Sequence, residues 1–123
     1  MATTGEFLWV DSEPQLDAVT ALSGSGPAYV FYFLEAMTRA GTGMGLTEQQ
    51  AHQLAVGTFV GASELARRSD DPPSVLRQRV TSKGGTTYAA LQSMEHDAVA
   101  EKFMQAMQAA RQRAHELGDE FGK

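Results

Sequence analysis

One apolar segment constrains the fold of this chain more than any other. The ten residues from Ala28 to Met37, AYVFYFLEAM, contain a single charged side chain, Glu35. At helical spacing their apolar side chains lie on all sides of the helix and not on one stripe. A chain of 123 residues that folds only into helices has little core with which to surround such a helix. We therefore expect a partner subunit to cover its second face.

The remaining segments also show helical patterns. Capping residues, breaking residues and apolar spacing predict about six helices, and the chain contains no internal repeat and no strand-like alternation. The most regular pattern lies near the C-terminus, where apolar residues recur at steps of three and four: Val99, Phe103, Met107, Ala110, Ala114 and Leu117. Gly118 is expected to end that helix. The predicted fold class is all-α, a helical bundle of about six helices.

Glycines mark a break in the chain and an expected close approach of two helices. The run from Ser23 to Pro27 separates two helices, and Pro27 suits the first turn of the second because a proline lacks the N–H that would be unpaired there. Gly57 and Gly61 are four residues apart and therefore share a helix face. This spacing predicts near backbone contact between two helices at that face.

Composition excludes several classes of function. The chain has 15 acidic and 10 basic side chains, a net charge of -5, and no extended basic cluster, so we expect no nucleic-acid binding. No apolar run approaches the roughly 20 residues that cross a bilayer, so we expect no membrane span. The absence of cysteine fits a reducing compartment, and we expect a cytoplasmic protein. The three histidines are far apart in sequence, which argues against a metal site.

The loop from Val80 to Thr87, VTSKGGTT, concentrates the groups that bind an anion. Gly84 and Gly85 carry no Cβ, so their backbone N–H groups can approach a ligand closely. A helix that begins at Thr86 adds free N–H donors and the positive end of its dipole. Together with the nearby hydroxyls these groups suit a small carboxylate. The residues alone leave open the alternative that the loop is an ordinary helix cap in a glycine turn.

Two motifs of this sequence resemble the C-terminal domain of the pyrroline-5-carboxylate reductase family. The first is Asp17 to Tyr29, DAVTALSGSGPAY, and the second is Val80 to Thr87, preceded by Pro73 and Leu76 and followed by Ala90-Leu91. The resemblance extends over roughly residues 7 to 118. It implies a domain of an enzyme that reduces 1-pyrroline-5-carboxylate to L-proline with NADPH or NADH, the last step of proline biosynthesis.

The resemblance also implies an assembly and a domain organisation. The helices of this domain would interlock with those of a second subunit to form a homodimer, and in the family such dimers commonly assemble further into decamers. Residues 1–10 would be a linker from a nucleotide-binding domain that this chain lacks, and residues 11–123 would form the helical dimerisation and substrate-binding domain. The isolated chain would then be inactive. The alternative is a stand-alone helical oligomerisation module that binds no ligand.

The resemblance assigns roles to residues of the glycine loop. The Ser82 hydroxyl and the backbone N–H groups around Gly84, Gly85 and Thr86 would bind the substrate carboxylate. Thr87 would be the catalytic residue, with its hydroxyl directed at the ring nitrogen that gains a proton. Lys83 stands where the family frequently has a proline, and we expect the backbone donors nearby to survive that change.

Overall fold

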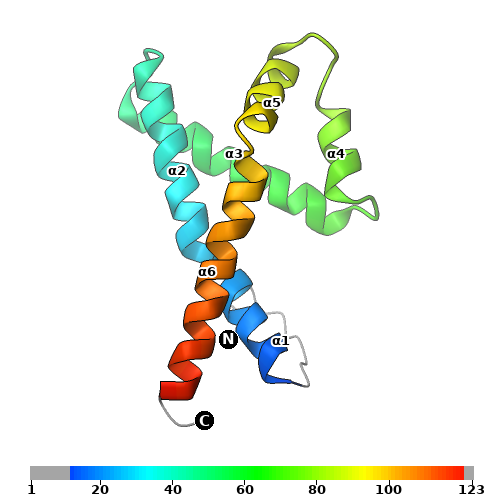
Figure 1. The fold of residues 1–123 in the computed structure, drawn as a ribbon. Coiled ribbons are helices and arrows are strands. Elements are labelled where there is room, and N and C mark those ends of the chain that lie inside the picture. Colours follow the sequence, from blue (N-terminus) through cyan, green and yellow to red (C-terminus); the bar gives the residue numbers. More distant parts are fainter. Residues whose placement is uncertain (1–11, 121–123) are drawn as a thin grey trace. The chain divides into compact units, whose positions relative to one another are not determined.

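The protein is all-helical in the part that the computed structural model describes, residues 12–120. That part contains six α-helices and one π-helical turn and no strand (Figure 1). The elements are α1 (Glu13–Val19), η1 (Thr20–Gly24), α2 (Gly26–Gly43), α3 (Glu48–Arg68), α4 (Pro73–Arg79), α5 (Thr86–His96) and α6 (Val99–Glu120). The predicted all-α class is confirmed. The expected linker at residues 1–10 lies outside the described residues.

Local capping explains where α1 and α3 begin. Ser12 is the N-cap of α1, and its hydroxyl accepts a hydrogen bond from the N–H of Gln15 at 3.4 Å. Thr47 precedes α3 in a capping box. Its hydroxyl accepts from the N–H of Gln50 at 3.1 Å, and the Gln50 Oε1 accepts from the N–H of Thr47 at 2.9 Å. These starts follow from the sequence alone because both partners lie within four residues of each other.

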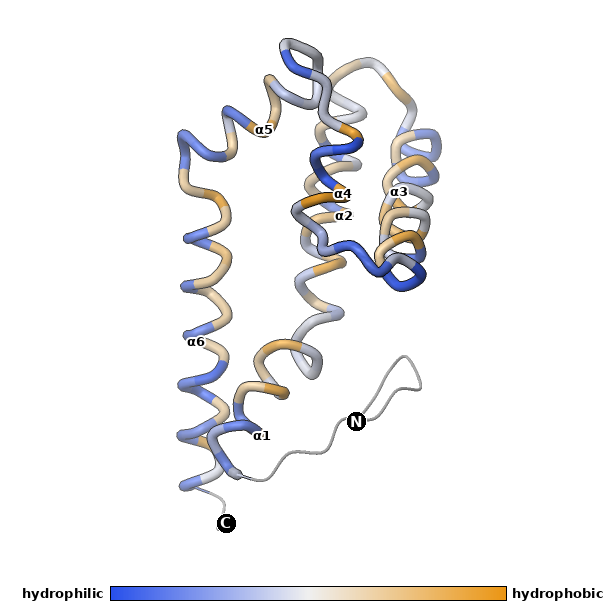
Figure 2. Tube along the Cα trace, turned by 90° about the vertical axis from the view of Figure 1, so that its right-hand side faces the viewer, coloured by the Kyte–Doolittle hydropathy of each residue, from blue (hydrophilic) through white to orange (hydrophobic). Residues whose placement is uncertain are grey.

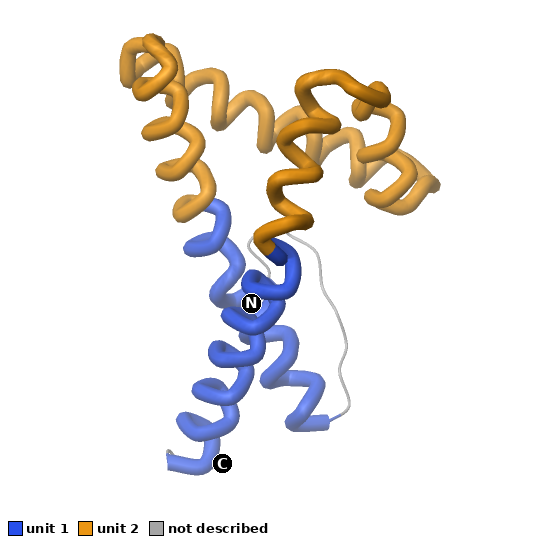
Figure 3. Tube along the Cα trace, turned by 45° about the horizontal axis from the view of Figure 1, so that its top comes forward, with its two compact units in different colours: residues 1–30, 98–123 blue, residues 31–97 orange. Residues whose placement is uncertain are grey.

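The chain divides into two compact units (Figure 3). The first unit comprises residues 1–30 and 98–123, and in it α1, η1 and α6 pack together. The Tyr29 hydroxyl donates to the Ala21 carbonyl at 2.6 Å, and the Tyr29 ring meets the Phe103 ring edge-on with centroids 5.4 Å apart. Ala21 is buried. Tyr29 therefore fixes η1 against α6.

The sequence did not predict the π-helical turn η1. The N–H of Ser25 donates to the Thr20 carbonyl at 2.8 Å, a bond that spans five residues. We expected a break between two helices here, but the chain continues to wind in this wider turn until α2 begins at Gly26. Pro27 lies in the first turn of α2, as predicted. The hydrogen bond from Tyr29 to Ala21 explains how the wider turn is held, since it satisfies a carbonyl of η1.

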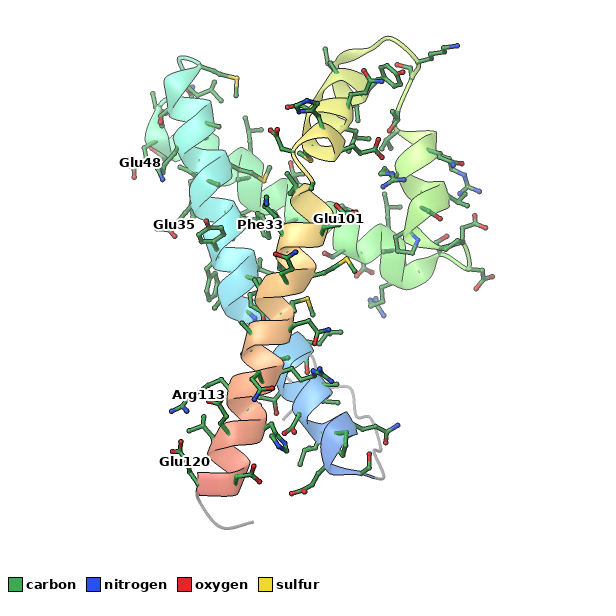
Figure 4. All side chains as sticks on the ribbon, viewed as in Figure 1. Phe33, Glu35, Glu48, Glu101, Arg113 and Glu120 are labelled. Carbon is green, nitrogen blue, oxygen red and sulfur yellow. The ribbon has the colours of Figure 1, made fainter. Side chains whose placement is uncertain are left out.

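Helix α6 is longer than expected, and ion pairs link charged side chains in its last turns. It continues through Gly118 to Glu120, so the predicted stop at Gly118 is wrong. Arg113 pairs with Glu116 at 3.2 Å and with Glu120 at 3.4 Å, and Figure 4 labels Arg113 and Glu120 on this helix. The i,i+3 pair offsets part of the roughly 1 kcal/mol that a glycine costs within a helix.

The second unit, residues 31–97, is built around a close approach of α2 and α3. A Cβ added at Gly41 would lie 2.8 Å from the Cβ of Ala51, so only glycine allows this distance. Ala51 and Ala55 are buried in α3. By contrast, a Cβ added at Gly57 or Gly61 would meet no atom of the described residues within 4 Å. The close contact predicted at Gly57 and Gly61 is therefore wrong within a single chain.

Apolar side chains remain exposed throughout the described residues. Within residues 12–120 the buried hydrophobic residues are three alanines, Ala21, Ala51 and Ala55. Apolar residues recur along α2 and α3 (Figure 2), and Phe31 and Tyr32 of α2 are 64% and 68% exposed. Among the described helices none combines the length and the apolar character of a membrane span. The described chain thus leaves large hydrophobic side chains in contact with solvent, which is characteristic of surfaces that other protein covers.

Candidate functional site: the turn that opens α5

The candidate site lies in the second unit, where the chain passes from α4 to α5 (Figure 1). Helix α4 ends when the N–H of Val80 donates to the Arg77 carbonyl at 3.2 Å. Thr81 completes this end, because its N–H donates to the Gln78 carbonyl at 3.1 Å and its hydroxyl donates to the Arg77 carbonyl at 2.6 Å. Thr81 is therefore used in ending α4, and the candidate site begins at the next residue.

Ser82 to Gly85 form a tight turn. The N–H of Gly85 donates to the Ser82 carbonyl at 3.0 Å, and Gly84 has a φ of +78°. Lys83 has a negative φ. A four-residue turn with a positive φ only at its third position is a type II turn. Glycine at position 84 is required by this backbone conformation, which a side chain would strain.

The turn delivers three free N–H donors at the start of α5. Gly85 is the N-cap, and no side chain of the described residues caps this helix. The first helical hydrogen bond is donated by the N–H of Ala89 to the Gly85 carbonyl at 3.1 Å. Among the hydrogen bonds of residues 12–120, the N–H groups of Thr86, Thr87 and Tyr88 therefore have no acceptor. They point out of the positive end of the helix dipole, where a carboxylate is favoured.

Hydroxyl groups flank these donors. Ser82, Thr86 and Thr87 are exposed, and within the described part of the chain their hydroxyls make no hydrogen bond that would occupy them. Lys83 is the one charged side chain between Val80 and Thr87, and it too is exposed. The turn and the start of α5 thus offer backbone donors for an anion, hydroxyls for a neighbouring polar atom and one positive charge, within the seven residues from Ser82 to Tyr88.

The structure differs from the sequence-based expectation in one donor. Gly85 was expected to offer its N–H to a carboxylate, but that N–H is engaged with the Ser82 carbonyl in the turn. The N–H of Tyr88 is one of the donors that a helix beginning at Thr86 was expected to add, although it was not named individually. A helix that begins at Thr86 necessarily leaves the N–H groups of its first three residues unpaired, so the predicted start of α5 already contained this signal. Ser82 and Gly84 lie in the turn, and Thr86 and Thr87 are the first two residues of α5.

Comparison with known proteins identifies the relatives of this chain. The family described as "Pyrroline-5-carboxylate reductase dimerisation" matches residues 13–117. The chain belongs to this family. A pyrroline-5-carboxylate reductase from Pseudomonas aeruginosa is 45% identical over 123 residues, which is the whole of this chain and 45% of that protein.

Solved structures of reductases agree with the assignment to the pyrroline-5-carboxylate reductase dimerisation family. A reductase from Coxiella burnetii matches with a TM-score of 0.85 and 44% identity, over 89% of this chain and 41% of that chain. The reductase from Plasmodium falciparum, solved with NADP bound, matches with a TM-score of 0.84 and 34% identity over 88% of this chain and 41% of that chain. The chain therefore spans less than half the length of the relatives that it matches.

Family membership raises the question of a nicotinamide cofactor. A dinucleotide is commonly bound where a glycine-rich turn joins a β-strand to a helix. Residues 12–120 contain no strand, and their glycine-rich turn joins the helices α4 and α5. The described residues therefore do not fit the role of a dinucleotide-binding site, and we assign them no step that involves the cofactor.

Proposed function

We propose that this chain supplies the homodimer interface and the substrate-carboxylate site of a pyrroline-5-carboxylate reductase. Such an enzyme is an oxidoreductase that uses NADPH or NADH to reduce 1-pyrroline-5-carboxylate to L-proline, the last step of proline biosynthesis. The observation that carries the proposal is the type II turn at Ser82 to Gly85, which leaves three N–H groups and the Ser82 hydroxyl free at the start of α5, in a chain of this family.

The proposed carboxylate site uses backbone groups more than charge. Thr86, Thr87 and Tyr88 offer N–H donors in the first turn of α5, and the Ser82 hydroxyl adds a fourth donor. A carboxylate has about four lone-pair positions, which matches these donors in number. Hydrogen bonds to a charged group contribute about 1.5–3 kcal/mol each. A few such bonds are enough for recognition of a small carboxylate on a protein whose net charge is -5.

Thr87 is proposed to act on the ring nitrogen. Reduction of the imine carbon leaves this nitrogen in need of a proton, and a hydroxyl held nearby can hydrogen-bond the nitrogen and relay a proton from water. Thr87 is the second residue of α5, next to the carboxylate donors, and its hydroxyl is exposed. Threonine is too weak an acid to be the proton source itself, so its role is to orient and polarise the imine.

The proposed partner is a second copy of the chain. Residues 12–120 bury no large hydrophobic side chain completely, although α2 carries Phe31 and Tyr32 and α3 carries Leu54, Val60 and Leu65, all more than half exposed. Burial of apolar surface is the dominant favourable term in association. Helices that interlock with those of a second copy would cover this surface. Assembly of such dimers into a decamer stays a prediction.

Binding of L-proline to the chain tests the carboxylate site. L-proline retains the carboxylate of the substrate, and pyrrolidine is a matched ligand that lacks it. In amide spectra of the ¹⁵N-labelled chain we expect L-proline at millimolar concentration to shift the N–H signals of Thr86, Thr87 and Tyr88. Ser82→Ala should weaken this response, whereas Ser93→Ala, which removes an exposed hydroxyl from the other end of α5, should not.

Two outcomes would contradict the proposal. Equal shifts with pyrrolidine would mean that the carboxylate is not recognised. If L-proline shifts none of these three amide signals while the chain is still a stable dimer, the alternative of a helical oligomerisation module that binds no ligand would be favoured. The role of Thr87 is tested separately in a reductase that carries this domain, where Thr87→Ala should lower kcat/KM by roughly ten- to a thousandfold.

A further inference from the structure

The two glycines of the turn are adjacent but are required for different reasons. Gly84 has a φ of +78°, and a Cβ added to it would meet no atom of the described residues within 4 Å. Glycine is therefore required at position 84 because of the backbone conformation and not because of space. Gly85 has a φ of -90° and a ψ of -172°, which is extended backbone that any residue adopts. Glycine is therefore required at position 85 because a side chain would have no room there.

The space beside Gly85 is occupied by the Ser82 side chain. A Cβ added at Gly85 would lie 2.7 Å from the Ser82 Oγ and 3.3 Å from the Ser82 carbonyl oxygen. The first distance is shorter than real Cβ atoms allow, and the second is tight. The Ser82 hydroxyl sits at the end of a single rotatable bond, so it can escape such a Cβ by changing its χ1 rotamer. A side chain at position 85 would therefore displace the hydroxyl before it disturbed the turn.

We propose that Gly85 is a positioning residue, whose missing side chain leaves the space in which the Ser82 hydroxyl lies beside the N-cap of α5. This inference rests on the proposed function, because it concerns the hydroxyl that is proposed to bind the substrate carboxylate. The N–H of Gly85 closes the turn, and its bare Cα gives the hydroxyl its place beside the free donors of α5. Gly85 thus acts through Ser82 and not by touching the ligand.

The rotamer of Ser82 in the ligand-free chain gives the first test. Three-bond couplings across χ1 report which rotamers the side chain populates. We expect Ser82 to hold one rotamer in the wild-type chain and to change it in Gly85→Ala, while Lys83→Ala, at an exposed neighbour with a negative φ, leaves the rotamer in place. Unchanged couplings in Gly85→Ala would overturn the inference. This measurement needs no ligand, so it decides the role of Gly85 even if L-proline fails to bind and the proposed function falls.

A double-mutant cycle on L-proline binding gives the second test. Ser82→Ala and Gly85→Ala should each raise the dissociation constant by about tenfold or more, the size expected for one hydrogen bond to a charged group. The combined variant should bind no more weakly than Ser82→Ala alone, because the hydroxyl is already lost. If Gly85→Ala weakens binding by the same factor with and without the Ser82 hydroxyl, it acts through the turn itself and the inference is wrong.

Discussion

Replacement of Phe31 by alanine should disrupt the proposed dimer without unfolding the single chain. Phe31 lies in α2, in the apolar segment that the sequence marks as too hydrophobic for one chain to cover, and it is 64% exposed. Because most of its side chain contacts no other part of the chain, the substitution removes little that stabilises the protomer. It also replaces phenylalanine by alanine within a helix, which raises helix propensity slightly.

The expected magnitude follows from the exposed area. An aromatic side chain buries about 150–250 Å² when it is fully covered, so the exposed fraction of Phe31 corresponds to about 100–160 Å² in each protomer. At about 25 cal/mol per Å² this is about 2.5–4 kcal/mol for each copy. If the partner covers half of that surface in both protomers, the dimer loses about 2.5–4 kcal/mol in total. The dissociation constant should then rise between about sixtyfold and seven-hundredfold.

Sedimentation equilibrium over a range of protomer concentrations measures this change directly. Arg39→Ala is the matched control, since Arg39 is an exposed residue of the same helix and its loss removes charge and not apolar surface. We expect the control to dissociate as the wild-type chain does. A wild-type chain that sediments as a monomer at micromolar concentration would refute the reasoning, and so would a Phe31→Ala variant as tightly associated as the control.

Three further predictions concern local structure in the described residues. Lys83→Pro should stabilise the folded chain by about 0.4–1 kcal/mol in urea unfolding at fixed protomer concentration, since proline suits the second position of a type II turn and the N–H of Lys83 makes no hydrogen bond. Ala98→Gly should stabilise it by up to about 1 kcal/mol in the same assay, because Ala98 has a φ of +55°. Hydrogen bonds from Arg67 and Arg68 hold the pKa of the Glu64 carboxyl below its usual range, so Arg67→Ala should raise that pKa in a carboxyl NMR titration.

Each of these predictions has an outcome that contradicts it. Lower stability of Lys83→Pro would mean that the turn needs the N–H of Lys83. A loss of stability in Ala98→Gly would mean that packing of the Ala98 methyl group contributes more to stability than the strained backbone costs. For Glu64 the depressed pKa implies that the interaction stabilises the folded chain at high pH and is lost as the pH falls through the folded-state pKa. An unchanged titration in Arg67→Ala would contradict that assignment.

Helix starts were predictable because their causes are local. Ser12 with Gln15, and Thr47 with Gln50, are pairs three residues apart, and Pro27 lies in the first turn of α2 as its chemistry requires. The same holds for the candidate site, where a glycine pair before Thr86 sufficed to predict the start of α5 and its free donors. Caps and turns depend on neighbours in the sequence, so the sequence by itself determined them.

Other features depend on contacts between distant segments. The π-helical turn η1 is fixed by Tyr29, whose ring rests on Phe103 of α6, and no local pattern shows that contact. The tertiary structure likewise places the close approach of α2 and α3 at Gly41 and Ala51, not at the more conspicuous pair of glycines in α3.

The turn at Ser82 to Gly85 combines both kinds of information. Its glycines, hydroxyls and position before a helix are visible in the sequence, which therefore predicted a possible anion site there, with an ordinary helix cap as the alternative. Only the folded turn decided that the Gly85 N–H is used internally and that the missing Gly85 side chain leaves room for the Ser82 hydroxyl. The reason is geometric: which donors stay free depends on the dihedral angles of the folded backbone, and a residue sequence does not fix these angles one by one.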